Sequence, residues 1–229
     1  MGSALPIGTI FGIHVRVDTT LLFLFLLFGY QGFTSGGVHG AADQLTFLVF
    51  LFLSIFLHEF GHAGAAAIFG IRTLDVTLHF FGGYARLSQP PRRPLEEAAI
   101  AIAGPAVNLA IAGGLYAVLV AHGVSDNLTF LDPYTRLLDN LLYANLALAI
   151  FNLLPGFPLD GGSFVRALLS LWLSRPLARM IVAYLGVLIG FALAAYALAN
   201  GMTTTIILGL LLVYIASMEA IAARRAMGS

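Results

Sequence analysis

Three ionisable side chains, His58, Glu59 and His62, lie within five consecutive residues of an apolar stretch. Residues four apart share one face of a helix, so the two imidazoles lie one above the other. Two neutral histidines at this spacing can bind one Zn²⁺, and the glutamate between them can act as general base on a water that the metal activates. The alternative is that all three are packing or solvent-facing groups near a helix end. Because three such groups cluster in one apolar helix, the pattern favours the metal site.

Asp160 is the best candidate for a third ligand, because a catalytic zinc site normally has three protein ligands and one open position. It lies in the segment Asn152 to Gly162, where two prolines and three glycines must interrupt the helix. A broken segment between apolar helices is tolerated only where it is buried in protein or lines a wet cavity. In the alternative interpretation Asp160 caps a following helix at Gly161 to Leu173. The two roles are compatible.

The amino-acid composition indicates the environment in which these residues lie. Of the 229 residues, 59% are apolar and 10% are charged, whereas a soluble domain usually carries about 25% charged residues. The mean hydropathy is +0.94. The sequence therefore predicts an integral α-helical membrane protein. Cysteine is absent, so any metal must be held by nitrogen and oxygen ligands. The net charge of zero gives no signal for nucleic-acid binding.

The apolar segments predict six membrane-spanning helices within a single membrane domain, residues 1–229. The expected spans are 19–33, 45–69, 98–122, 138–154, 178–200 and 203–222. Every positively charged residue is an arginine, and with a cytoplasmic N-terminus only Arg136 of the eleven falls outside. This asymmetry predicts that both termini are cytoplasmic. His58 then lies 13 residues into the second span, about 20 Å deep at 1.5 Å per residue and toward the cytoplasmic side.

Two stretches outside these spans show the period-two alternation of strands, Ile7 to Val17 and Thr73 to Leu87. In the second, Gly82 and Gly83 provide a turn, which indicates a hairpin. The expected fold class is therefore an all-α membrane protein with six transmembrane helices and a small β-sheet or hairpin at the cytoplasmic membrane surface. No removable signal peptide is expected, since a basic region followed by a cleavable apolar stretch is missing from the N-terminus.

Four blocks of this sequence resemble the site-2 protease family of zinc-dependent intramembrane metalloproteases. They occur in family order and span about half of the chain: His58-Glu59-Phe60-Gly61-His62, Phe81-Gly82-Gly83, Ala103-Gly104-Pro105-Ala106-Val107-Asn108, and Asn152 to Gly162. The combination is highly specific. Two departures stand out: Ser163 replaces an arginine that is common after the paired glycines, and the sequence includes neither the CBS modules of the subset it most resembles nor a PDZ module. Either the sequence is part of a longer protein or it represents a minimal core of the family.

The resemblance implies one Zn²⁺ per chain, with His58, His62 and Asp160 as ligands and Glu59 as general base. Asn152 would bind the substrate carbonyl or stabilise its oxyanion, and Asn108 is expected mainly to pack the third helix near the site. The implied substrate is a transmembrane protein such as an anti-sigma factor or a membrane-tethered transcription factor. A prokaryotic plasma membrane is the expected location.

Two other functions fit parts of the pattern. A zinc-binding transporter or sensor could also place His and Asp in a helix bundle, but it needs a polar path, and spans three, five and six have almost no ionisable residues. A catalytically silent membrane scaffold predicts loss of Glu59, which is present. The remaining histidines occur singly, at His14, His39, His79 and His122, and are expected to be structural or interfacial. An exposed strand edge in Thr73 to Leu87 could hold an unwound substrate by strand addition.

Overall fold

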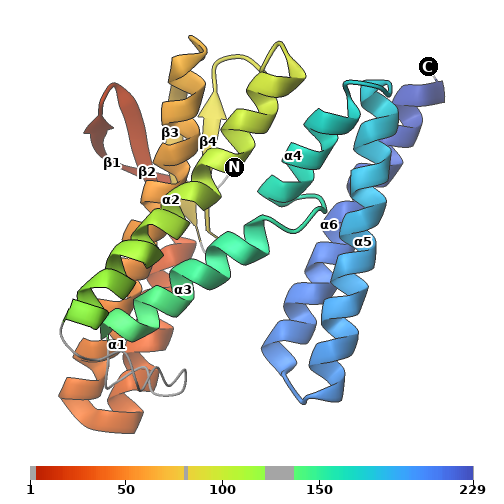
Figure 1. The fold of residues 1–229 in the computed structure, drawn as a ribbon. Coiled ribbons are helices and arrows are strands. Elements are labelled where there is room, and N and C mark those ends of the chain that lie inside the picture. Colours follow the sequence, from red (N-terminus) through yellow and green to blue (C-terminus); the bar gives the residue numbers. More distant parts are fainter. Residues whose placement is uncertain (1–3, 80–81, 122–136, 229) are drawn as a thin grey trace. The chain divides into compact units, whose positions relative to one another are not determined.

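The computed structural model describes residues 4–79, 82–121 and 137–228, which form helices and one small sheet (Figure 1). The chain divides into two compact units, Met1–Pro90 with Ala103–Ala149, and Pro91–Ile102 with Ile150–Ser229. Three features of the sequence prediction lie outside the described residues, namely Phe81, the end of the third span at His122, and Arg136.

The first unit carries a four-stranded sheet in the order β1-β2-β3-β4. Strands β1 (Ala4–Ile10) and β2 (Ile13–Asp18) form one antiparallel hairpin, and β3 (Thr73–His79) and β4 (Gly82–Leu87) form another. Both predicted strand regions are confirmed. The two hairpins join through a parallel pair, β2 with β3, and a parallel pair requires a long crossover connection. Helix α1 is that crossover, and β4 is left at an edge of the sheet.

Helix α1 (Thr20–Ile68) consists of two helical arms that fold against each other. Gly36 and Gly37 have non-helical backbone angles, and the φ of 62° at Gly37 suits glycine. Leu21 and Leu48 belong to one buried cluster, yet a straight helix would separate them by about 40 Å at 1.5 Å per residue. The chain therefore reverses at the glycines. The arms correspond to the first and second predicted spans, and the second begins earlier than expected.

Two further helices complete the first unit, α2 (Pro94–Ala121) and α3 (Leu137–Asn152), each of which also contributes residues to the second unit. Proline and two glutamates occupy the first turn of α2, where a missing N–H and negative charge are both favourable. Ala112 and Leu119 of α2 pack with Leu142 of α3 in a buried apolar cluster. This packing holds the two helices side by side, as Figure 1 shows for the green part of α2 and α3.

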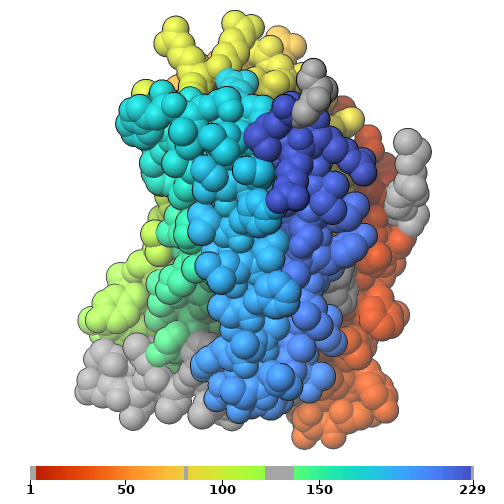
Figure 2. Space-filling model, turned by 90° about the vertical axis from the view of Figure 1, so that its right-hand side faces the viewer, coloured from red at the N-terminus to blue at the C-terminus, as the bar shows by residue number. Residues whose placement is uncertain are grey.

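The second unit contains α4 (Asp160–Leu169), α5 (Arg175–Ala199) and α6 (Thr203–Gly228). Figure 2 shows α5 and α6 packed along their length, in lighter and darker blue. Glycines permit this approach, because a Cβ on Gly190 would lie 2.8 Å from the carbonyl oxygen of Gly209. A Cβ on Gly162 would lie 2.5 Å from the Gly156 carbonyl, so the paired glycines let the irregular segment fold onto the first turn of α4.

Within the described residues, four helices are long and apolar enough to cross a membrane, namely α1, α2, α5 and α6, while α3 is a shorter apolar helix of 16 residues. All six predicted spans coincide with helical segments, because α1 contributes two arms. The mostly helical architecture with a small sheet is thus confirmed. Six complete membrane crossings remain a prediction, since α3 is shorter than the roughly 20 residues that a span needs.

Candidate metal centre

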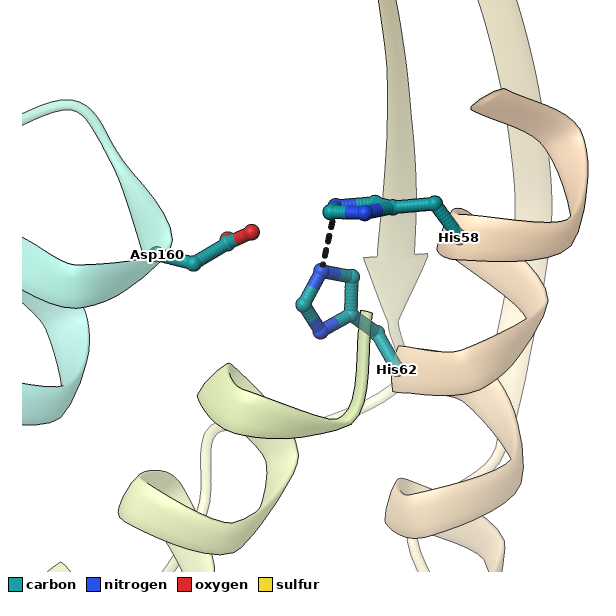
Figure 3. A group of neighbouring side chains, drawn as sticks. All are labelled: His58, His62 and Asp160. Atoms are coloured by element: carbon teal, nitrogen blue, oxygen red, sulfur yellow. Dashed lines mark hydrogen bonds between the residues drawn. The ribbon is translucent and has the colours of Figure 1, made fainter. Parts of the chain in front are cut away.

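The two histidines of the predicted site point their Nε2 atoms at one another from successive turns of α1 (Figure 3). The Nε2 atoms of His58 and His62 are 3.1 Å apart, and the rings meet edge to face at 82°. Two ring nitrogens come this close when they share a proton or a metal ion. Two nitrogen ligands on a tetrahedral zinc lie about 3.3 Å apart when each Zn–N distance is about 2.0–2.1 Å. The two histidines spaced four residues apart therefore form a pair whose geometry suits a metal ion.

Glycine on the neighbouring helix leaves room for these rings. A Cβ on Gly104 of α2 would lie 2.7 Å from the His58 Nε2 and 2.6 Å from the His62 Cε1. A Cβ on Gly61 of α1 would lie 2.7 Å from the carbonyl oxygen of Ala103. Since real Cβ atoms essentially never approach so closely, only glycine fits either position. The two helices thus meet closely at the level of the histidines, and the space beside the ring nitrogens stays open.

Asn108, on the same helix as Gly104, holds the other nitrogen of one histidine. Its Oδ1 lies 2.6 Å from the Nδ1 of His58, and both residues are buried. An amide oxygen only accepts, so His58 Nδ1 donates and its Nε2 carries the lone pair. That is the tautomer a metal at Nε2 requires. The packing role expected for Asn108 from the sequence was incomplete, because this residue contacts a predicted ligand directly.

Two residues that the sequence reasoning missed continue this contact. The Nδ2 of Asn108 donates to the Oδ1 of Asn145 on α3 at 2.9 Å. The Nδ2 of Asn145 donates in turn to the Ser54 Oγ at 3.1 Å and to the Leu141 carbonyl at 2.9 Å. For Asn145 the sequence does contain a signal, an amide within an otherwise apolar run, since polar groups in such helices are costly unless they have a partner.

Glu59 is buried beside the sheet of the same unit. It is 8% exposed, and a Cβ on Gly83 of β4 would lie 2.7 Å from its Cγ and 3.1 Å from its Oε1. The turn glycine of the predicted hairpin thus lets a strand backbone pass against the predicted general base. The two motifs are separate in the sequence, and the fold brings them together.

The remaining predicted site residues, Asp160 and Asn152, belong to the second compact unit. Asn152 is the last residue of α3 and Asp160 the first of α4. Leu159, not Asp160, holds the N-cap position, and Asp160 lies in the first turn, where a negative charge is favourable. Figure 3 draws Asp160 with the two histidines. These three side chains offer two imidazoles and one carboxylate, a donor set that suits zinc.

The other histidines in the described residues make contacts within the sheet or lie exposed. His14 Nδ1 is 3.1 Å from the Thr9 hydroxyl across the first hairpin. His79 packs near the Tyr84 ring at 5.8 Å between centroids. Burial lowers the pKa of His79, and the charge of Asp18 partly opposes that shift. His39 is exposed near the bend of α1. The structural or interfacial role expected for these histidines stays a prediction.

Comparison with known proteins identifies the family. A sequence model described as peptidase family M50 matches residues 46–132 and 124–197. The chain belongs to peptidase family M50. A candidate zinc metalloprotease of Synechocystis sp. is 34% identical over 179 residues, which are 73% of this chain and 45% of the relative. A zinc metalloprotease of Methanocaldococcus jannaschii is 32% identical over 171 residues, which are 74% of this chain and 47% of the relative.

The solved structures include a close match in fold for this M50 chain. The site-2 protease from Methanocaldococcus jannaschii superimposes with a TM-score of 0.68 at 28% identity, covering 95% of each chain. The resemblance inferred from the four sequence blocks is thereby confirmed, and the chain is a multi-pass integral membrane protein. It spans about half the length of the curated relatives that it matches, 45% and 47% for the two named above.

Proposed function

We propose that this chain is an intramembrane zinc metalloprotease that hydrolyses peptide bonds within or near transmembrane segments of other membrane proteins. The observation that carries the proposal is the His58 and His62 pair, whose Nε2 atoms meet 3.1 Å apart in an apolar helix, next to the buried Glu59. Its membership of peptidase family M50 adds independent support, since its relatives carry zinc metalloprotease names. Regulated intramembrane proteolysis is the corresponding biological activity.

In this proposal His58, His62 and Asp160 hold one zinc ion per chain in an HExxH-type site. The assignment of the two histidines as ligands is supported by their geometry within α1 and by Gly104, which has no side chain to fill the space beside their rings. Asp160 is supported by its donor chemistry and by its match to the family segment that ends in paired glycines. When bound, zinc supplies Lewis acidity, which makes water nucleophilic near neutral pH and polarises a carbonyl group.

The protein residues then handle the proton and the developing charge. Glu59 takes the proton from the attacking water and passes it to the leaving amine. Asn152 donates a hydrogen bond to the oxygen that becomes negative on the scissile carbonyl. The burial of Glu59 suits this role, because a general base shielded from bulk water interacts more strongly with the reacting proton.

The substrate must be unwound locally, because helical peptide bonds are shielded. The outer edge of β4 can receive an extended segment by strand addition, and its Gly83 backbone passes beside Glu59. Proline substitutions at Tyr84, Ala85 and Arg86, made one at a time, should therefore impair cleavage of a membrane-segment substrate. A proline at Ile7, on the opposite edge strand β1, is the matched control. Full activity in all three β4 variants would rule out strand addition there.

The proposed setting is a prokaryotic plasma membrane with both termini in the cytoplasm. One relative is named stage IV sporulation protein FB of Bacillus subtilis and is 35% identical over 124 residues. The natural substrate is proposed to be a membrane protein such as an anti-sigma factor or a membrane-tethered transcription factor. The orientation rests on the arginine distribution, which leaves only Arg136 on the outer side.

The deciding experiment measures bound zinc and cleavage of a generic membrane-segment substrate by purified wild type and Glu59→Gln. We expect one zinc in both, and a loss of turnover in the variant of roughly 10²–10⁴-fold, the usual contribution of a general base. Glu96→Gln is the matched control, because its amide oxygen can still accept from the Arg92 N–H at the start of α2. Equal turnover in wild type and Glu59→Gln would refute the proposed protease activity. Zinc uptake into vesicles that survives Glu59→Gln would favour a transporter. Zinc binding without cleavage would favour a sensor or a scaffold.

A further inference from the structure

The buried amides beside His58 form a chain of hydrogen bonds with one direction. It runs from the His58 imidazole through Asn108 on α2 and Asn145 on α3 to Ser54 on α1, with distances of 2.6, 2.9 and 3.1 Å. Both asparagines are 0% exposed. Three helical segments therefore contribute to one polar path, which we call the amide relay: Ser54, Asn108 and Asn145.

The direction of the amide relay is set by backbone carbonyls, which can only accept. Leu141 O accepts from an Asn145 side-chain nitrogen at 2.9 Å, so that NH₂ group faces its own helix and Ser54. The Ser54 hydroxyl donates to Phe50 O at 3.1 Å, so its oxygen is free to accept from Asn145. The Oδ1 of Asn145 must then face α2.

The orientation of the Asn145 amide fixes that of the Asn108 amide. Because the Asn145 oxygen faces α2, Asn108 presents its NH₂ group to Asn145 and its oxygen to His58. If the Asn108 amide were flipped, its NH₂ group would face His58 and its oxygen would face the Asn145 oxygen, so two acceptors would meet without a donor. A buried arrangement of that kind would leave groups unpaired at considerable cost. His58 therefore keeps its proton on Nδ1 and its lone pair on Nε2.

We propose that Asn108 and Asn145 are positioning residues that lock His58 into the Nδ1–H tautomer and thereby prepare its Nε2 for the metal. The inference rests on the proposed zinc site. It extends that site to α3, because Asn145 acts on His58 through its hydrogen bond with Asn108. Partners of this kind typically contribute 10–100-fold to metal affinity.

The first test measures which tautomer His58 adopts. Full-length protein labelled with ¹⁵N-histidine, stripped of metal by a chelator and kept at a pH where imidazole is neutral, is studied by NMR, with His58→Gln used to assign the signal. Wild type should show protonated Nδ1 at His58. Asn108→Leu and Asn145→Leu should shift the population toward protonated Nε2. An unchanged His58 signal in both variants would overturn the proposal.

The second test titrates the same proteins with zinc against a competing chelator. Asn108→Leu should weaken binding by about 10–100-fold, and Asn145→Leu should weaken it less. Asn108→Asp should retain both the tautomer and near wild-type affinity, because a buried carboxyl group that keeps its proton donates to the Asn145 Oδ1 and accepts from the His58 Nδ1 through its other oxygen. This rescue separates positioning from simple packing, and it stays informative if the leucine variant folds poorly.

Gln44→Leu is the matched control, since Gln44 is a buried amide of α1 whose Oε1 has no hydrogen-bond partner among the described residues. It should leave both the tautomer and zinc affinity unchanged. If Asn145→Leu leaves both readouts at the wild-type value, the relay beyond Asn108 is wrong. Failure of wild type itself to bind zinc would instead refute the proposed metal site, so the two failures are distinguishable.

Discussion

The two compact units hold their helices together with different polar chemistry. In the first, neutral amides at Asn108 and Asn145 are completely buried and connect three helical segments. In the second, helices are joined by charges: Arg179 of α5 pairs with Glu219 of α6, and Arg166 of α4 pairs with Glu97 in the first turn of α2. Those pairs are partly exposed, with side-chain exposures of 43% and 12%, and of 29% and 20%.

The difference follows from what each kind of group specifies. An amide has one donor end and one acceptor end, so a chain of amides defines where a proton lies. A guanidinium only donates and a carboxylate only accepts, so a two-point pair such as Arg179 with Glu219 fixes how two helices meet but leaves no choice of tautomer to set. In the proposed metal site the first unit must present a particular ring nitrogen, whereas the charged pairs of the second unit join its helices.

Glycine shows the same division. Gly104 in the first unit leaves open the space beside the histidine nitrogens, whereas Gly190 and Gly209 in the second unit let two helix backbones approach. A substitution in the first case should damage the chemistry, and in the second the packing. Predictions that separate affinity for zinc from stability therefore test the comparison directly.

The largest effect is expected for Gly104→Ala. The new Cβ would fall 2.7 Å from the His58 Nε2 and 2.6 Å from the His62 Cε1, so the ligand rings themselves must move. We expect zinc affinity to fall by at least about 100-fold, the upper end of what a change around the ligands usually costs, and cleavage to be lost with it. Chelator competition and cleavage of a membrane-segment substrate measure the two effects.

Gly113→Ala is the control for that experiment, since it lies on the same helix and a Cβ there would meet nothing within 4 Å. It should bind zinc as wild type does. Near wild-type zinc affinity in Gly104→Ala would contradict the idea that this glycine reserves the space beside the ring nitrogens.

Much of this site could be predicted from local spacing. The interval between His58 and His62 determines that both rings share a helix face, and the structure confirms that they meet. The contact of His58 with Asn108 could not be predicted, because it depends on how closely α1 and α2 approach at Gly61. The role of Asn145 was still harder to predict from the sequence, since it contacts the site only through Asn108 on another helix.

The fold shows the same limit. Strand alternation and apolar runs are local, so both strand regions, the second hairpin and the helical segments could be anticipated, whereas the turn between Ile10 and Ile13 was not. The parallel pairing of β2 with β3 depends on the reversal of α1 at Gly36 and Gly37, which returns the chain to the sheet. That pairing leaves β4 at the edge, and no local pattern contains this information.

The smallest effect is expected at the charged pair of α5 and α6. Glu219→Gln leaves Arg179 without its carboxylate, so thermal stability in detergent should fall. The loss should be about 1–2 kcal/mol, below the 3–5 kcal/mol typical of a fully buried pair, because the Arg179 side chain is 43% exposed. The double variant Arg179→Met/Glu219→Leu should recover most of that stability, since apolar replacement of both partners is often nearly neutral. Zinc affinity and the His58 tautomer should match wild type in both. A loss of zinc affinity in Glu219→Gln as large as that in Asn108→Leu would break the comparison, because the charged pair would then serve the metal site as the amides do.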